Sequence, residues 1–384
     1  MNKEISEDVQ DEPVQDDLFG APPTPPSRPT AKSLVSAADE ADANPDSVDD
    51  KTSSKPSRRA GLQPFDWKPE LRALGAALPP NVRLGTSSWS YPGWTGLVWE
   101  SSASEQTLSR KGLPVYSQHP LLRTVSIDRS FYRPLTASDY ARYAAQVPPE
   151  FRFMVKAPSL ITDALVRSDD GRGKEPNPAF LSPELALQEF VAPALEGLGR
   201  TLGALVFQLS PLPWNMLERL PETIERLGRM LSALPTLAPL APDGVIAVEV
   251  RDPQWLAPDM LPLFASALRE GHATYCVGLH AKMPPLSEQL KLLRKLWPGP
   301  LVCRWNLHPI HGPYGYADAE KLYSPYDRIH HPEPELHAEL ARLIQTFASH
   351  GQNVYVAISN HAEGCAPLSV QSLATRIDAL QPPR

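Results

Sequence analysis

Residues 83–99 read RLGTSSWSYPGWTGLVW, a stretch in which a short apolar strand changes into an aromatic loop. Val82, Leu84 and Thr86 alternate with other residue types, as expected for a β-strand. The loop holds three tryptophans and several hydroxyl groups, and such residues both pack well and contact ligands through their polar atoms. We therefore expect a strand that opens onto a binding site, with tryptophan packing at a barrel rim as the alternative.

Strand-like and helix-like segments alternate through the rest of the chain. The eight expected strands cover residues 82–86, 123–128, 151–156, 204–209, 245–251, 273–278, 301–306 and 353–359. The expected helices cover residues 137–146, 182–202, 214–234, 258–270, 287–296, 333–350 and 368–380. This order predicts parallel strands joined by crossover helices.

Eight such strands favour an α/β fold of the TIM-like (β/α)₈ barrel type over a doubly wound open sheet. The turn GTSSW after the first strand is neither GxGxxG nor a P-loop, so it does not support the open sheet. The 384 residues suit one barrel preceded by a tail. We expect the tail over residues 1–61 and the barrel domain over residues 62–384.

The predicted tail differs from the barrel in composition. It holds thirteen acidic and seven basic residues, eight prolines and a single aromatic residue, Phe19. Such a segment cannot bury enough apolar surface to offset chain entropy, so we expect it to be disordered. The tail carries a net charge of −6 out of −7 for the whole chain, so the barrel is nearly neutral and its global charge neither favours nor excludes nucleic acid.

One short motif interrupts the tail. Residues 15–19 read QDDLF and resemble the QxDLF peptide by which bacterial DNA-repair and replication proteins dock on the sliding clamp. The apolar pair Leu18 and Phe19 could fill a pocket, Gln15 could bond to backbone at its edge, and Asp17 completes the motif. A chance match is the alternative.

Cysteine usage and the N-terminus indicate the compartment. Cys276, Cys303 and Cys365 are odd in number and widely spaced, which fits neither a disulfide framework nor a metal knuckle. The chain lacks a signal-peptide pattern at its start and any apolar run of about 18 residues. We expect a soluble, cytoplasmic protein without a membrane partner.

Polar residues recur at the carboxyl ends of the expected strands. In barrels of this type, catalytic groups lie at these ends, whereas the outward face of each strand is covered by helices. Unpaired charges cannot lie under the helix layer, so we expect these side chains to converge inside the mouth. They are Ser126, Asp128, Lys156, Gln208, Glu249, Arg251, Arg304 and Asn306. The alternative is a salt-bridge network that only fills the barrel.

The predicted mouth is locally positive, because three cations face two carboxylates. Guanidinium groups match phosphate and carboxylate oxygens in pairs, so an anionic ligand is expected. In a reaction, Glu249 or Asp128 would be the general base, and Lys156 or Arg304 would stabilise developing negative charge. Aromatic side chains that could stack on a sugar or a base are those of Trp89, Tyr91, Phe131, Tyr132 and Trp255.

Histidines in the late loops raise the question of a metal. His308, His311 and His361 could join Glu249 or Asp128 as ligands, whereas the pair 330–331 is expected to be exposed. HExxH and CxxC spacings are absent, so we assign no metal ligands; a divalent metal stays open as the less favoured alternative, and the cofactor is unknown. GxSxG is absent too, which disfavours a serine hydrolase.

Taken in order, the motifs resemble the YecE-like family, whose central module is the domain of unknown function 72. The matching blocks are LGTSSWSYPGW, SFYRPL, FRFMVKAP followed by IT, LVFQLSP, VEVRDPQW and VYVAISNHAEG. The resemblance covers residues 82–380 and implies a TIM-like barrel of unestablished activity. The pocket residues it implies are Trp89, Tyr91, Trp94, Phe131, Tyr132, Lys156, Gln208, Glu249, Arg251, Trp255, Arg304 and Asn360.

The chain departs from the family pattern at several of these blocks. The usual Glu-x-Asn after the second strand stands here as Ser126 and Asp128, and the usual pair of asparagines after the eighth strand as residues 359–360, Ser-Asn. Two usual histidines are replaced by Asp163 and Asp252. Loss of the carboxylate at position 126 weakens a two-carboxylate mechanism.

Three functions follow as hypotheses. The first is an enzyme, such as a hydrolase or a lyase, or a degenerate relative that binds a phosphate-bearing ligand, with nucleic acid favoured by the clamp-like peptide. The second is an enzyme of sugars or other anionic metabolites. The third is a non-catalytic adapter that binds the clamp through the tail and a ligand through the mouth.

Overall fold

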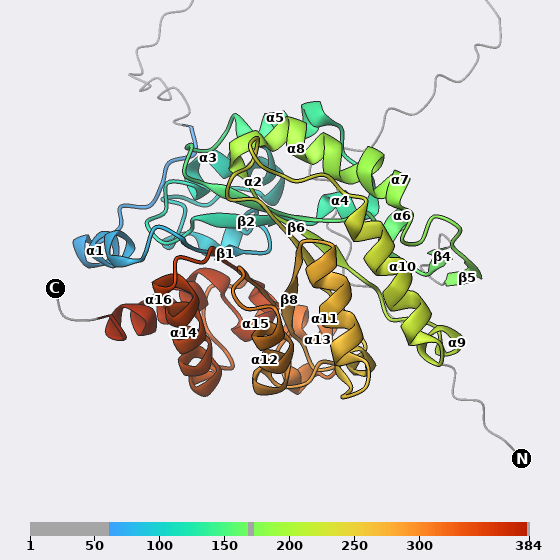
Figure 1. Cartoon of the computed structure of the whole chain (residues 1–384). Helices are drawn as coiled ribbons and strands as arrows, with labels where there is room; N and C mark the ends of the chain where they lie inside the picture. The colour runs from blue at the N-terminus through green and yellow to red at the C-terminus, as the bar shows by residue number, and fades with distance from the viewer. Residues whose placement is uncertain (1–60, 168–172, 382–384) are drawn as a thin grey trace, which may run out of the picture.

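The computed structural model describes residues 61–167 and 173–381 of the chain. Its centre is a closed barrel of eight parallel strands (Figure 1). Around the barrel the strands follow the order β1 (Val82–Thr86), β10 (Val354–Ile358), β9 (Leu301–Trp305), β8 (Ala273–Leu279), β7 (Val245–Glu249), β6 (Leu202–Gln208), β3 (Arg152–Lys156) and β2 (Thr124–Ile127). Residues 1–60 of the predicted tail, which include the clamp-like peptide at residues 15–19, lie outside the described residues.

The first and last strands of the barrel close the sheet. On β1, Val82 pairs with Val354 of β10, and Gly85 pairs with Thr124 of β2, both in parallel register. The prediction of a TIM-like barrel is therefore confirmed, and the alternative of an open sheet is wrong. Each expected strand matches an observed one to within a few residues at its ends.

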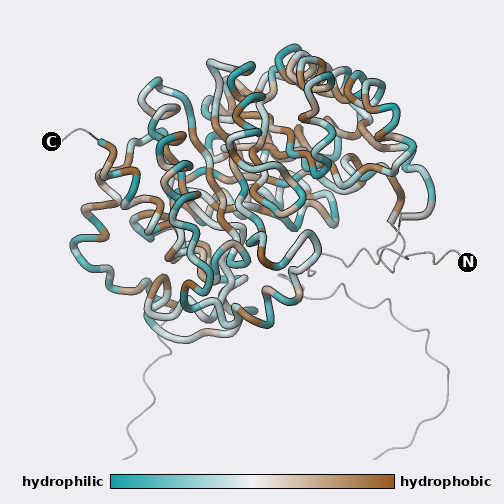
Figure 2. Tube along the Cα trace, turned by 90° about the horizontal axis from the view of Figure 1, so that it is seen from below, coloured by the Kyte–Doolittle hydropathy of each residue, from teal (hydrophilic) through white to brown (hydrophobic). Residues whose placement is uncertain are grey.

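Helices surround the barrel, and in Figure 2 hydrophobic and hydrophilic residues alternate along them. The neighbours α5 and α8, α10 and α11, and α14 and α16 pack in pairs. The helices are α1 (Pro69–Ala77), α2 (Glu105–Lys111), α3 (Leu113–Tyr116), α4 (Arg129–Tyr132), α5 (Ala137–Ala144), α6 (Ser159–Thr162), α7 (Pro183–Ala186), α8 (Ala192–Leu198), α9 (Trp214–Leu217), α10 (Leu220–Ser232), α11 (Leu261–Glu270), α12 (Leu286–Lys295), α13 (Tyr316–Tyr323), α14 (Pro334–Ser349), α15 (Asn360–Glu363) and α16 (Ala366–Ala379). No helix within the described ranges is long and apolar enough to cross a bilayer.

Some elements differ from the sequence prediction. The helix expected over residues 182–202 is divided into α7, a π-helical turn at Leu187–Val191 and α8, and its last residue already belongs to β6. A small antiparallel hairpin, β4 (Leu165–Arg167) and β5 (Gly173–Pro176), was not expected, nor were α1, α2 and α13. These elements lie in connections that lack the strong periodicity of the main strands and helices.

The barrel interior is layered. At the amino ends of the strands, Arg152 donates to Asp243 Oδ2 from Nη2 at 2.7 Å, and Arg83 Nη2 lies 3.0 Å from the same oxygen. Tyr355 donates its hydroxyl to the carbonyl of Asp243 at 2.7 Å. An apolar layer follows, made by Met154, Ala204, Val206, Ala247, Cys276, Val302, Tyr355 and Ala357. Polar residues fill the opposite, carboxyl end of the barrel.

The carboxyl group of Asp243 makes the free energy of unfolding depend on pH in the acid range. Burial would raise the pKa of its carboxyl, but the hydrogen bond from Arg152 and the charge of Arg83 outweigh burial and lower the pKa. A lowered folded-state pKa adds stability above the unfolded value of about 4, and this stability is lost as pH falls through the folded value. We expect Asp243→Asn to be less stable than wild type at neutral pH, by a difference that shrinks on acidification.

Denaturant titrations at a series of pH values would measure this difference. Asp66→Asn is the matched control, because that side chain is fully exposed and lies 3.5 Å from Arg72. A deficit for Asp243→Asn that stayed constant from neutral to strongly acidic pH would contradict the assignment.

Candidate functional site

A cluster of charged and amide side chains closes the carboxyl end of the barrel interior. We call it the mouth cluster, and it consists of Asp128, Gln208, Glu249, Arg251, Arg304 and Asn306. Arg304, the penultimate residue of β9, is its centre. It donates from Nη1 to Gln208 Oε1 at 2.7 Å and to Glu249 Oε2 at 2.8 Å, and from Nη2 to Asp128 Oδ2 at 2.8 Å. Residues from three other strand ends thus meet one guanidinium.

A second guanidinium completes the cluster. Arg251 Nε lies 2.9 Å from Glu249 Oε1, and Arg251 Nη2 donates to Gln208 Oε1 at 2.9 Å. Asn306 Nδ2 donates to Glu249 Oε1 at 3.3 Å. The two-residue period of a strand places Glu249 and Arg251, like Arg304 and Asn306, on one face. Residues expected to converge from the sequence pattern do so here.

Burial and charge oppose each other inside the cluster. Burial would raise the pKa of Glu249, but the guanidinium groups of Arg251 and Arg304 outweigh it and lower the pKa. Burial would likewise lower the pKa of Arg304, but the carboxylates of Asp128 and Glu249 outweigh it and raise the pKa well above its ordinary value. Both groups are therefore charged at neutral pH.

Lys156, the last residue of β3, adds a further cation beside the cluster. It is only 2% exposed, and its Nζ lies 3.7 Å from the centre of the Phe131 ring, a cation–π contact. Lys156, Arg251 and Arg304 set against Asp128 and Glu249 leave one excess positive charge among these five groups. A low-dielectric site with an excess positive charge favours an anion.

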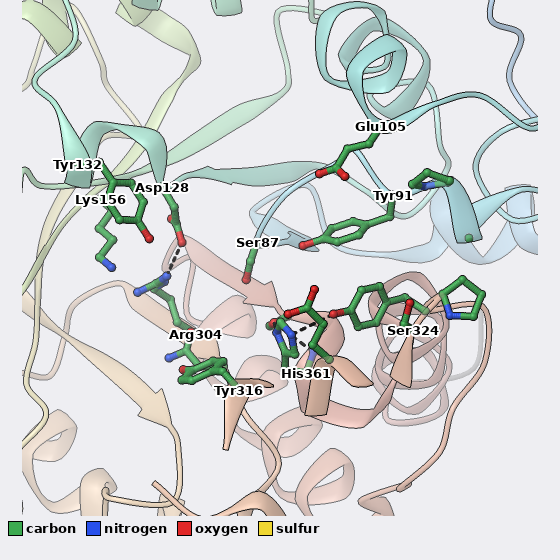
Figure 3. A pocket seen from close by; sticks show the side chains of 17 residues that line it. Ser87, Tyr91, Glu105, Asp128, Tyr132, Lys156, Arg304, Tyr316, Ser324 and His361 are labelled. Atoms are coloured by element: carbon green, nitrogen blue, oxygen red, sulfur yellow. Dashed lines mark hydrogen bonds and ion pairs between the residues drawn. The ribbon is translucent and has the colours of Figure 1, made fainter. Parts of the chain in front are cut away.

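A cavity of about 420 Å³ adjoins the mouth cluster, and Lys156 and Arg304 are among its lining residues (Figure 3). In Figure 3, Lys156, Asp128 and Arg304 lie on one side of the cavity, Tyr91 and Glu105 on the other, and Ser87 between them. Its volume is that of a small-molecule pocket. The lining residues are Ser87, Tyr91, Pro92, Gly93, Glu105, Asp128, Tyr132, Lys156, Arg304, Asn306, Tyr316, Glu320, Ser324, Pro325, Tyr326, Ser359 and His361.

Two connections far apart in sequence form one wall of the cavity. The aromatic loop after β1 contributes Tyr91, whose ring centre lies 5.3 Å from that of Tyr326 in the connection between β9 and α14. The two segments touch closely, because a Cβ added to Gly93 would lie only 1.8 Å from the Pro325 carbonyl oxygen. Glycine at position 93 is therefore required for the wall to form.

The residues predicted to bind a ligand divide into two groups in the structure. Those that line the cavity are Tyr91, Asp128, Tyr132, Lys156, Arg304 and Asn306. The others are buried and do not line the cavity: Trp89, Trp94, Phe131, Gln208, Glu249, Arg251, Trp255 and Asn360.

The three loop tryptophans are core residues, as the alternative interpretation held. Trp94 and Trp99 are fully buried, and Trp89 packs edge-on against Tyr143 with ring centres 5.9 Å apart. Trp94 Nε1 donates to Asn360 Oδ1 at 3.3 Å, which joins the first loop to the last one. Their packing holds the loop backbone, and that backbone presents Ser87 and Tyr91 to the cavity.

Sequence reasoning missed the lining residues contributed by α2 and by the β9–α14 connection. Glu105 comes from α2, Tyr316 and Glu320 from α13, and Tyr326 from the segment after it. None of these lies at the carboxyl end of a strand, the position at which the sequence pattern predicted site residues. The concentration of tyrosines over residues 314–326 was the available signal.

The late histidines form hydrogen-bonded networks outside the mouth cluster. His308 Nε2 pairs with Glu333 Oε1 at 2.8 Å, and His311 shares the Tyr323 hydroxyl with His331. The expectation that residues 330–331 are exposed is wrong, because both are half-buried beside Tyr323. Within the described part of the chain, no group of three or more His, Cys, Asp or Glu side chains is arranged to hold a metal.

The two aspartates that depart from the family pattern support the loop after β6. Asp163 accepts a hydrogen bond from Ser210 Oγ, and Asp252 Oδ2 accepts one from the Leu212 backbone N–H at 2.9 Å. Neither lines the cavity. Both replacements therefore act on the rim of the barrel.

Fold and site together define a (β/α)₈-barrel protein with a polar, ligand-sized cavity at the carboxyl ends of its strands. Residues 83–383 match the family model described as protein of unknown function DUF72. The chain belongs to this family, which is also the YecE-like family that the sequence motifs indicated.

One solved structure agrees with this assignment at the level of the fold, and a second is reported beside it for comparison. A DUF72 family protein of Enterococcus faecalis is 19% identical, with a TM-score of 0.50 over 79% of this chain and 99% of that one. A DUF72 family protein of Thermotoga maritima is 18% identical, with a TM-score of 0.45 over 78% and 98%. No curated protein matches the chain.

Proposed function

We propose that this DUF72 protein binds, in the mouth of its barrel, a small molecule that carries a phosphate or carboxylate group. The observation that supports this most directly is that two buried cations, Lys156 and Arg304, line one side of a ligand-sized cavity. Guanidinium and ammonium groups in a buried site bind such anions strongly. The anionic group of the ligand would lie against these two cations.

If the ligand is also a substrate, Asp128 is the candidate for the general base. It is the carboxylate of the mouth cluster that lines the cavity, whereas Glu249 is fully buried beneath it. Ser126 donates to Asp128 Oδ1 at 2.5 Å, and Arg304 holds Oδ2. These two contacts fix the orientation of the carboxylate, as a general base requires. Glu249 would then act through charge, by holding both arginines in place.

Binding of ethyl phosphate to the full chain would test the proposal. We expect Lys156→Met to weaken this binding about tenfold, because it removes a buried charge from the anion site while keeping the side-chain length. Lys282→Met is the matched control. Lys282 also lies over a tyrosine, Tyr314, with its Nζ 4.0 Å from the ring centre, but outside the cavity.

Calorimetry with ethyl phosphate, butyrate and a short single-stranded DNA would distinguish the ligand classes. Equal affinity of the wild type and Lys156→Met for every anion would contradict the proposal. If the DNA binds more tightly than ethyl phosphate and butyrate, and its binding depends on Lys156, nucleic acid would be the favoured ligand class. The clamp-like peptide supports the same interpretation.

A further inference from the structure

The cavity carries opposite charges on its two sides. Buried Lys156 and Arg304 line one side of the cavity. The carboxylates of Glu105 and Glu320 also line the cavity. Figure 3 shows Glu105 and Tyr91 across the cavity from Lys156 and Arg304. A ligand that is anionic throughout would meet repulsion on the glutamate side.

Two tyrosine rings accompany the glutamates. Tyr91 and Tyr326 meet edge to face, with ring centres 5.3 Å apart, and both line the cavity. Burial raises the pKa of Tyr91, and the charges of Glu105, Asp128 and Glu320 raise it further. Burial raises the pKa of Tyr326, and Tyr91, Glu320 and Glu105 raise it further. Neutral phenol rings beside carboxylates attract an organic cation through cation–π and Coulomb interactions.

Ser87 marks the middle of the cavity. In Figure 3 it lies between the cationic side and the tyrosine side. Its hydroxyl oxygen is buried and has no hydrogen-bond partner among residues 61–167 and 173–381. Buried hydroxyl groups are nearly always hydrogen-bonded, so a ligand atom that passes between the two sides would pair with it.

We infer that the ligand is zwitterionic, with a phosphate or carboxylate against Lys156 and Arg304 and an ammonium group between the tyrosines and Glu105 and Glu320. This inference rests on the proposed anion site and adds the chemistry of the other end of the ligand. It also gives the glutamates opposite the cations a role: they select against anions that lack the ammonium group.

Matched series of probes test the inference on the full chain. The first series is ω-aminoalkyl phosphates of increasing length, each compared with the alkyl phosphate of the same length. The second compares ω-amino carboxylates with simple carboxylates and so distinguishes the two anionic groups. We expect at least one amino compound to bind about five- to tenfold more tightly than its partner, as an ion pair near the surface with a cation–π contact would give.

The double variant Glu105→Gln/Glu320→Gln should abolish this preference without weakening binding of the alkyl phosphate. Asp318→Asn is the control, since Asp318 lies on the same helix as Glu320 but outside the cavity. The inference is overturned if no amino compound is preferred, or if the preference survives in the double variant. Alkyl phosphate binding that still depends on Lys156 would then leave the proposed function standing, whereas no binding by either series would end both.

Discussion

Replacing Glu249 by glutamine is expected to lower the free energy of unfolding by about 3–5 kcal/mol, the usual cost of breaking a buried ion pair. Glu249 is fully buried and accepts contacts from Arg251, Arg304 and Asn306. Glutamine has the same shape but no charge, so two buried guanidinium groups lose a shared anion. Denaturant unfolding at neutral pH, where the lowered pKa keeps the wild-type carboxyl ionised, measures the effect.

Two comparisons isolate the cause of this loss. Glu288→Gln breaks an exposed pair with Lys291, and we expect a change within about 0.5 kcal/mol. Adding Arg251→Met to Glu249→Gln should recover part of the stability, because it removes one of the uncompensated cations. A loss below about 1 kcal/mol for Glu249→Gln would contradict the assignment of Glu249 as the anion that both arginines require.

Gly85→Ala is expected to destabilise the barrel by about 3 kcal/mol, because the new methyl group has no space. A Cβ at this position would lie 1.8 Å from the carbonyl oxygen of Thr124 and 2.6 Å from its carbonyl carbon. Both atoms belong to the backbone of β2, so β1 and β2 would have to separate where their pairing closes the barrel. Thermal or denaturant unfolding would report the loss.

Another barrel glycine provides the control for this substitution. A Cβ on Gly278 of β8 would lie 3.5 Å from Glu249 Oε1, an ordinary van der Waals distance. Alanine is also favoured over glycine in a strand by about 0.5–1 kcal/mol, so we expect Gly278→Ala to be neutral or slightly stabilising. Equal stabilities of the two variants would contradict the steric explanation for Gly85.

The barrel could be predicted from the sequence because its strands are short, apolar and regularly separated by helix-length segments. The strand Val82–Thr86 was predicted to the residue, since its alternation ends sharply at the serines that follow. The prediction of one continuous helix over residues 182–202 was wrong in the interior of that segment. Apolar spacing continues through the π-helical turn and into β6, and spacing alone does not reveal a change of hydrogen-bonding pattern.

The mouth cluster could be predicted from the sequence for a geometric reason. Parallel strands end on one side of the barrel, so charged residues at their ends must meet, as Asp128, Glu249 and Arg304 do. The wall could not be predicted in this way, because Glu105, Glu320 and Tyr326 lie in connections whose paths no periodicity specifies. Aromatic residues were ambiguous for a different reason: Trp89 and Tyr91 stand two positions apart, yet one packs in the core and the other lines the cavity.

The close contact between Gly93 and Pro325 has a consequence for how such barrels diversify. It joins two surface connections into a wall that is anchored by backbone, so the side chains on that wall can be exchanged while the ion pairs of the strand ends stay intact. If the cavity binds a ligand as proposed, relatives with the same barrel but different residues at positions 105, 316, 320 and 326 would bind different ligands. Under that proposal, substitutions in these connections would change ligand selectivity during evolution with little loss of stability of the barrel.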